Sequence, residues 1–193
     1  VTVSTSISQY HHGDLRTALI EAGLEALEGP DGDAPSLRAL ARIVGVSPTA
    51  VYRHFPDKQA LLDALAQEGL AKLGGAQKAA MERAGGGASG FSETGREYVR
   101  FALAHPALFR LMFSQGNPGR FHSDVPDPAR DLLYAMTRSI TGGNEEEADR
   151  LAMQAWAIAH GVAMLMLDGR IAAREDQISR LINSETLFPS GSC

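Results

Sequence analysis

The sequence predicts an all-α protein in which a small N-terminal domain of three helices precedes a larger helical domain. Apolar residues recur at helical spacing along most of the 193 residues, and no long alternation of apolar and polar residues predicts a strand. Capping residues, glycines and prolines fall between the apolar segments, so the expected helices have definite ends. The net charge of −5 argues against a strongly basic protein that coats a polymer, although it leaves room for a local basic surface.

The first helix is expected over residues 14–28. One face at helical spacing carries Leu15, Ala18, Leu19, Ala22 and Ala26. The glycines and prolines of residues 29–35 end this helix. Residues 1–13 are polar, which predicts a flexible N-terminal arm.

Two short helices are expected next. Ser36 is placed to cap the second helix, and Gly45 ends it because glycine adopts the left-handed conformation without strain. Ser47 followed by Pro48 is typical of an N-cap and a first helical position, so the third helix should run from Pro48 to His54.

A long helix is expected from Asp57 to about Arg83, and the glycine-rich segment 84–92 predicts the clearest break in the chain. Four later starts carry capping signals, at Ser92, Pro106, Asp127 and Asn144. The remaining expected elements are helices at about 92–104, 106–114, 128–141, 144–168 and 173–186, with a long loop at 116–128.

The strongest motif lies in residues 37–56, where Ala41, Gly45 and Val51 have the spacing of a helix-turn-helix. That motif needs a small residue where two helices cross, glycine at the turn, and a β-branched residue that wedges the second helix onto the first. A tight helical hairpin without a nucleic-acid role explains the spacing equally well.

The expected exposed face of this motif favours binding to DNA. It carries Ser47, Thr49, Tyr52, Arg53 and His54, with Lys58 just after them. Lys58 falls in the first turn of a helix, where the helix dipole disfavours a cation unless an anion such as a phosphate docks there. An ordinary surface lysine is the alternative.

The segment SLRALARIVGVSPTAVYRHFPDKQALL (36–62), preceded by HHGDLRTALIEAGLEAL, resembles the DNA-binding region of the TetR family of bacterial transcriptional regulators. The resemblance implies that the third helix binds double-stranded DNA. The bases or nearby backbone would face Thr49, Tyr52 and Arg53, at a helix that starts with Pro48. The phosphates would contact Ser36, Arg38, Ser47, His54 and Lys58.

The resemblance also implies a domain order and a ligand. We expect a helix-turn-helix domain over 14–60, a helical ligand-binding and dimerisation domain over 61–186, and a tail over 187–193. The segment AWAIAHGVAMLMLDG (155–169) resembles the Trp…His-Gly helix of one C-terminal subfamily, the WHG type. That resemblance does not name the ligand.

The helix expected at 144–168 carries two apolar stripes, which predicts burial on two sides. One seam consists of Leu151, Ala155, Ile158, Val162 and Leu165. Together with the helix at 173–186, this seam predicts a homodimer on a near-palindromic operator. A central core helix of a monomer is the alternative.

A small apolar ligand is expected to bind in the second domain. The candidate ligand-binding residues are Tyr98, Phe101, Phe109, Met112, Phe113, Met153, Trp156, His160 and Met164. Helical spacing makes plain core packing the alternative for most of them, and His160 is as well explained as a satisfied core histidine.

The motifs of other protein classes are weak or lacking. The glycine pattern at Gly85, Gly87 and Gly90 follows a polar helix with no strand before it, so we expect no cofactor, and His11, His12 and Asp14 make a poor metal site. We expect no enzyme, no membrane span and no secretory signal, and therefore a cytoplasmic protein. Together with this expectation, the resemblance to the TetR family implies a repressor that a small apolar molecule releases from DNA. A helical small-molecule-binding protein or enzyme with an incidental helix-turn-helix is the alternative.

Overall fold

The structure is a computed structural model that describes residues 15–30, 32–114 and 126–184, and these residues form nine helices without a strand. The predicted arm at 1–13, the predicted tail at 187–193 and most of the predicted loop at 116–128 lie outside them. The chain divides into two compact units, Val1–Leu65 and Ala66–Cys193.

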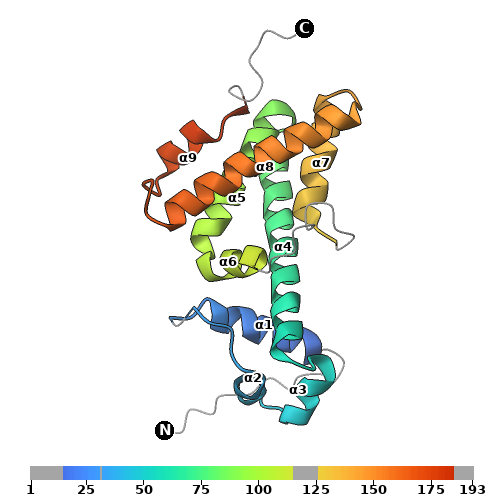
Figure 1. Ribbon diagram of the computed structural model, residues 1–193, viewed down its shortest axis with the longest axis vertical. Coiled ribbons are helices and arrows are strands. Elements are labelled where there is room, and N and C mark those ends of the chain that lie inside the picture. Colours follow the sequence, from blue (N-terminus) through green and yellow to red (C-terminus); the bar gives the residue numbers. More distant parts are fainter. Residues whose placement is uncertain (1–14, 31, 115–125, 185–193) are drawn as a thin grey trace. The chain divides into compact units, whose positions relative to one another are not determined.

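The first unit contains three complete helices and the beginning of a fourth (Figure 1). Their bounds are α1 Leu15–Leu27, α2 Leu37–Val44, α3 Pro48–His54 and α4 Lys58–Arg83. The second unit contains the rest of α4 and five further helices. These are α5 Gly87–Ala104, α6 Pro106–Ser114, α7 Pro128–Ile140, α8 Glu145–Leu167 and α9 Glu175–Leu181.

Local signals in the sequence define the turn between α2 and α3. The Ser36 hydroxyl accepts a hydrogen bond from the Ala39 amide, and the Ser47 hydroxyl accepts one from the Ala50 amide. Gly45 ends α2 with φ 75°, in the left-handed region, and its amide bonds back to Ala41 and Arg42 carbonyls. The predicted caps and the predicted glycine turn are therefore confirmed.

The core of the first unit fixes α3 against α2. Ala41 and Val51 are 1% and 0% exposed, as the spacing of the motif predicts. Phe55, which follows α3, is also buried, and the Arg16 guanidinium of α1 lies 5.4 Å from the centre of its ring. A short helix of seven residues is thus held in one orientation by side chains from both neighbouring helices.

The second unit is organised around α5 and α8. Within this unit α8 packs on α5 and α7, and α5 also contacts α6 and α9 (Figure 1). The buried face of α8 is rich in alanine, which allows neighbouring helices to approach closely; its alanines are Ala148, Ala152, Ala159 and Ala163. The predicted seam on this helix is split, because Leu151 and Val162 are buried whereas Ile158 and Leu165 are 38% and 44% exposed.

Two predicted helix bounds are wrong. The helix expected to start at residue 92 begins at Gly87, because the break is confined to residues 84–86, where Gly85 and Gly86 have φ of 79° and 72°. Gly90 lies inside the helix, where an added Cβ would come within 3.1 Å of the Met81 side chain, so glycine permits this close approach to α4. The helix expected over 173–186 spans only Glu175–Leu181.

The chain after α9 is attached to α5 by polar contacts. Ser92 was expected to cap α5, but its hydroxyl lies within the helix, 2.8 Å from the Ser184 hydroxyl, and accepts a hydrogen bond from the Ser184 amide. Arg96 donates to the Ile182 carbonyl at 3.1 Å. An added Cβ at Gly95 would lie 2.7 Å from Ile182, so the glycine allows the segment to lie directly on α5.

By length and mean hydropathy, α8 is one helix of the described residues that is long and apolar enough to cross a membrane. Its first turn carries three glutamates, and its alanine-rich face packs on α5 and α7. These features are typical of a helix within a helical domain, although only 33% of its apolar window is buried.

Candidate nucleic-acid interface and aromatic cluster

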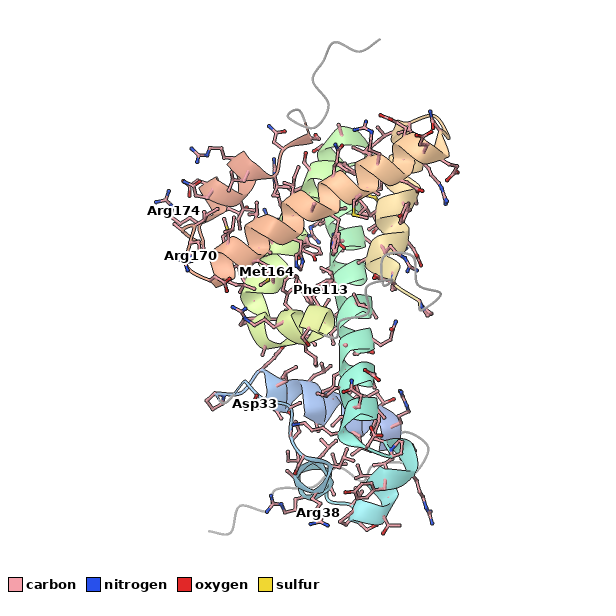
Figure 2. The ribbon with its side chains drawn as sticks, viewed as in Figure 1. Asp33, Arg38, Phe113, Met164, Arg170 and Arg174 are labelled. Carbon is pink, nitrogen blue, oxygen red and sulfur yellow. The ribbon has the colours of Figure 1, made fainter. Side chains whose placement is uncertain are left out.

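The side chains predicted to face DNA are all exposed on the first unit. They come from the start of α2, from α3 and from the start of α4, and are Ser36, Arg38, Ser47, Pro48, Thr49, Tyr52, Arg53, His54 and Lys58. Figure 2 shows Arg38 on α2, directed away from the helix. Tyr52 is 44% exposed, so its ring is accessible on this surface.

The two serines of this surface keep a hydroxyl proton that the capping bonds do not use. In each cap a lone pair of the hydroxyl oxygen accepts a hydrogen bond from a backbone N–H group. The nitrogen-to-oxygen distance is 3.2 Å at Ser36 and 3.3 Å at Ser47. The hydroxyl proton is therefore still available as a donor to an acceptor such as a phosphate oxygen.

The beginning of α4 differs from the simple picture of a free helix N-terminus. The Asp57 carboxylate accepts a hydrogen bond from the Ala60 amide at 2.8 Å, so one of the free amides is already capped by an anion. Lys58 itself is exposed. Any attraction to phosphate at this point therefore depends mainly on the Lys58 ammonium.

One basic residue of this surface escaped the sequence analysis. Arg42 lies on α2 one turn after Arg38 and is exposed. The signal was its spacing of four residues from Arg38, which places both guanidinium groups on one helical face. Together the two arginines extend the basic surface along α2.

Five of the predicted ligand-binding residues form one aromatic cluster in the second unit. Tyr98 of α5 meets Phe109 of α6 edge-on, with ring centres 5.4 Å apart. His160 of α8 stacks on Phe109 at 5.6 Å and lies 4.9 Å from Phe113 and 5.4 Å from Trp156. These residues come from α5, α6 and α8. Figure 2 labels Phe113 on α6 and Met164 on α8.

A chain of hydrogen bonds runs through the cluster. The Trp156 indole N–H donates to the Tyr98 hydroxyl at 3.2 Å, and that hydroxyl lies 2.9 Å from Nδ1 of His160. Burial raises the pKa of Tyr98 well above its ordinary value, so its phenol stays protonated. Burial also lowers the pKa of His160, which favours the neutral imidazole.

The other predicted ligand-binding residues lie apart from this hydrogen-bonded chain. Phe101 is buried, with its ring 4.8 Å from that of His105, and Met153 is 39% exposed. Met112 is buried on the side of α6 that faces α4. Met164 is half-buried on α8, one turn after His160.

The helix α6 lies between the aromatic cluster and α4. Phe109 and Phe113 belong to the cluster, whereas Leu108 and Met112 lie against Gly69 of α4. A Cβ added at Gly69 would come within 2.8 Å of Met112, so the two helices touch there with no space for a side chain. A shift of α6 within this unit therefore requires α4 to move at Gly69.

No group of three or more potential metal ligands is found within residues 15–30, 32–114 and 126–184. His11, His12 and Asp14, which the sequence analysis rejected as a metal site, lie outside these ranges.

Comparison with known families matches both parts of the chain. A family model described as "Bacterial regulatory proteins, tetR family" matches residues 19–65. A second, described as "Tetracyclin repressor-like, C-terminal domain", matches residues 91–185. The two matches fall on the helix-turn-helix and on the part of the chain that carries the aromatic cluster.

Solved structures and one curated protein are similar to this chain. A protein of unknown function from Rhodococcus sp. RHA1 is 34% identical, with 91% of this chain and 93% of that chain covered and a TM-score of 0.69. A TetR family transcription regulator from Marinobacter aquaeolei VT8 shares the fold at 19% identity, with coverage of 86% and 91% and a TM-score of 0.54. The nucleoid occlusion factor SlmA of Marinomonas sp. (strain MWYL1) is 42% identical over 52 residues, which is 27% of this chain and only 26% of that relative.

Proposed function

The chain belongs to the TetR family of bacterial transcriptional regulators, and from that premise we propose that it is a DNA-binding repressor. It binds a near-palindromic operator in the cytoplasm as a homodimer and is released by a small apolar molecule. Its role is regulatory and not enzymatic. The observation that carries the proposal is the exposed polar and basic surface of α2 and α3 beside the Gly45 turn.

In this proposal α3 enters the major groove of the operator. Thr49, Tyr52 and Arg53 are exposed on α3 and contact base edges or the nearby backbone. Arg38 and Lys58 contact phosphates on either side, with the serine hydroxyls as further donors. A protein with a net charge of −5 relies on these few local cations to approach DNA.

A gel-shift assay with the DNA upstream of the protein's own gene tests the proposal. Lys58→Ala is expected to weaken binding to all sequences and to reduce the salt dependence by about one unit of slope, because one phosphate contact is lost. Arg53→Ala is expected to change the preferred sequence, at a cost of about 1–3 kcal/mol for a lost base contact.

Lys78→Ala provides the matched control, because Lys78 is an exposed lysine of α4 in the second unit. It should leave both affinity and salt slope unchanged. If the wild-type protein binds no DNA but still binds small molecules, the helix-turn-helix is incidental and the proposal is wrong.

We place the dimer interface on the exposed face of α8. That face carries Ile158 and Leu165, both more than a third exposed, together with Ala157 and Gly161. A Cβ at Gly161 would meet nothing within 4 Å, so the face offers room for a second helix to approach closely. The helix α9 contributes less than the sequence suggested, because its Ile178 is already buried within the chain.

Release of DNA is proposed to begin at the aromatic cluster. A ligand among Phe113, Trp156 and His160 shifts α6, and α6 touches α4 at Gly69. Since α4 is one continuous helix from Lys58 to Arg83, the shift passes along it to the DNA-binding domain. The ligand must bind the two conformations with different affinity, and a coupling of about 1–3 kcal/mol changes operator affinity by roughly 5–150-fold.

A further inference from the structure

The hydrogen bonds of the aromatic cluster determine which ring nitrogen of His160 carries a proton. The Trp156 indole can only donate, so the Tyr98 hydroxyl oxygen accepts from it. The Tyr98 hydroxyl is buried and its own proton needs an acceptor, and within the described part of the chain the atom in range is Nδ1 of His160, at 2.9 Å. Tyr98 therefore donates to Nδ1, and the neutral imidazole carries its proton on Nε2.

The neighbouring rings hold this imidazole in one orientation. Phe109 lies nearly parallel to it at an interplanar angle of 28°, and Phe113 meets it edge-on at 72°. Trp156 approaches from the same helix one turn earlier. The Tyr98 hydroxyl is the hydrogen-bond partner of His160 and lies at Nδ1. The Nε2–H group is therefore a fixed donor without an acceptor among the described residues.

We propose that this cluster binds an uncharged aromatic compound with a carbonyl oxygen, which accepts a hydrogen bond from the Nε2–H group of His160. The compound stacks on the half-buried side chains of Phe113, Trp156 and Met164. The inference rests on the proposed function, because it names the chemical class of the effector.

The described surroundings of His160 favour an uncharged ligand over a charged one. The four rings in contact with it, those of Tyr98, Phe109, Phe113 and Trp156, are uncharged. A carboxylate beside Nε2–H would be taken out of water without a cation to pair with among these described neighbours of His160. A cation would face the hydrogen-bond donor instead of an acceptor.

The proton position is tested first, by long-range 1H–15N NMR of the histidine rings at neutral pH. The signals of His160 are assigned by their loss in His160→Phe. We expect protonated Nε2 and unprotonated Nδ1. A spectrum with the proton on Nδ1 overturns the inference, because His160 would then present an acceptor to the ligand.

Binding is then tested with three naphthalene probes that differ in one group: 2-acetylnaphthalene, 2-ethylnaphthalene and 2-naphthoate. Trp156 is the only tryptophan, so its indole N–H gives one NMR signal that reports binding at the cluster. The ketone is expected to bind about 3–10-fold more tightly than the hydrocarbon, the gain of one hydrogen bond. Equal affinities, tighter binding of the naphthoate, or no response to the ketone each overturn the inference.

Variants connect the preference to His160. In His160→Phe the ketone and the hydrocarbon should bind equally well, whereas the control His105→Phe, at the C-cap of α5, should keep the preference. Tyr98→Phe is a second variant, in which the proton is no longer confined to Nε2 and the preference for the ketone falls. An unchanged preference in both His160→Phe and Tyr98→Phe contradicts the inference. The gel-shift assay on the ligand-free protein tests the proposed function separately, so the two can fail independently.

Discussion

Protonation of His160 would disturb the chain of hydrogen bonds that joins Tyr98 of α5 to His160 and Trp156 of α8. Its Nδ1 accepts the Tyr98 proton, so a proton added to Nδ1 would face a donor in a buried position. Burial already lowers the pKa of His160 below its ordinary value of 6.5. The folded protein therefore binds this proton less readily than the unfolded chain does.

The stability of the protein is expected to fall in mild acid because of this single residue. As the pH drops below 6.5, the unfolded chain takes up the His160 proton before the folded chain does. The free energy of the unfolded state therefore falls relative to that of the folded state, until the pH passes the lowered pKa of the folded protein. Urea unfolding at pH 7.5 and 5.5 measures the effect. The loss of stability between the two pH values should be smaller for His160→Phe than for the wild type, and equal losses would contradict the prediction.

Sequence patterns predict some residues of the candidate sites and miss others for a physical reason. The exposure of Thr49 and Arg53 follows from the helical period of a short segment, so it is visible locally. The partnership of Tyr98 with His160 joins residues 62 apart, and it depends on how α5 packs on α8. Helical spacing made both side chains candidates for the ligand-binding site, but it did not indicate that they form a hydrogen bond with each other.

Close helix contacts in the second unit depend on glycine at particular positions of α4. Gly74 lies against the start of α7, where an added Cβ would be 2.7 Å from Pro128 and 2.8 Å from the Ala129 amide nitrogen. Its neighbour Gly75 faces open space. Of these two adjacent glycines, Gly74 is therefore required by the packing of α7, whereas Gly75 is not required by any contact.

Alanine substitution at these two positions should change stability in opposite directions. Gly75→Ala is expected to stabilise the protein by about 0.5–1 kcal/mol, because alanine loses less backbone entropy in a helix. Gly74→Ala is expected to destabilise it by about 1–3 kcal/mol, because backbone atoms of α7 must move. Chemical denaturation of both variants measures the difference, and a gain in stability for Gly74→Ala would show that α7 does not lie there.

The accuracy of the predicted elements follows the strength of their local signals. The bounds of α2 and α3 were predicted within a residue, since serine caps, Gly45 and Pro48 act on the nearest turn. The start of α5 was predicted five residues late, because Gly90 was counted against the helix. That glycine is favoured by its contact with Met81 of α4, which is a tertiary effect that helix propensity does not contain.

At the scale of the whole molecule, α8 has apolar side chains that the rest of the described chain leaves exposed. Its exposed residues Ile158 and Leu165 lie on a different face of the helix from the buried alanines that pack within the domain. In the proposed dimer, this face is buried against a second copy and so removed from water, and the two copies together supply two recognition helices. A dimer of this kind places them on successive major grooves, roughly 34–36 Å apart.

Charge on this surface should separate the two subunits. Ile158→Arg is expected to give a monomer at micromolar concentration and to weaken operator binding, because an unpaired guanidinium would be buried in the interface. Ile140→Arg is the matched control, since Ile140 is 42% exposed on α7 and outside the proposed interface. Analytical ultracentrifugation distinguishes the two variants, and a dimeric Ile158→Arg protein would place the interface elsewhere.

The hydroxyl pair of Ser92 and Ser184 has a consequence for how the protein folds. The two residues are 92 positions apart, so their contact closes a long stretch of chain and costs more conformational entropy than the neighbouring-helix contacts of α1, α2 and α3. Domains with local contacts fold faster than those that depend on distant pairs. We therefore expect the helix-turn-helix to reach its native form early during synthesis, while the second domain is completed only when the last helix has arrived and Ser184 meets α5.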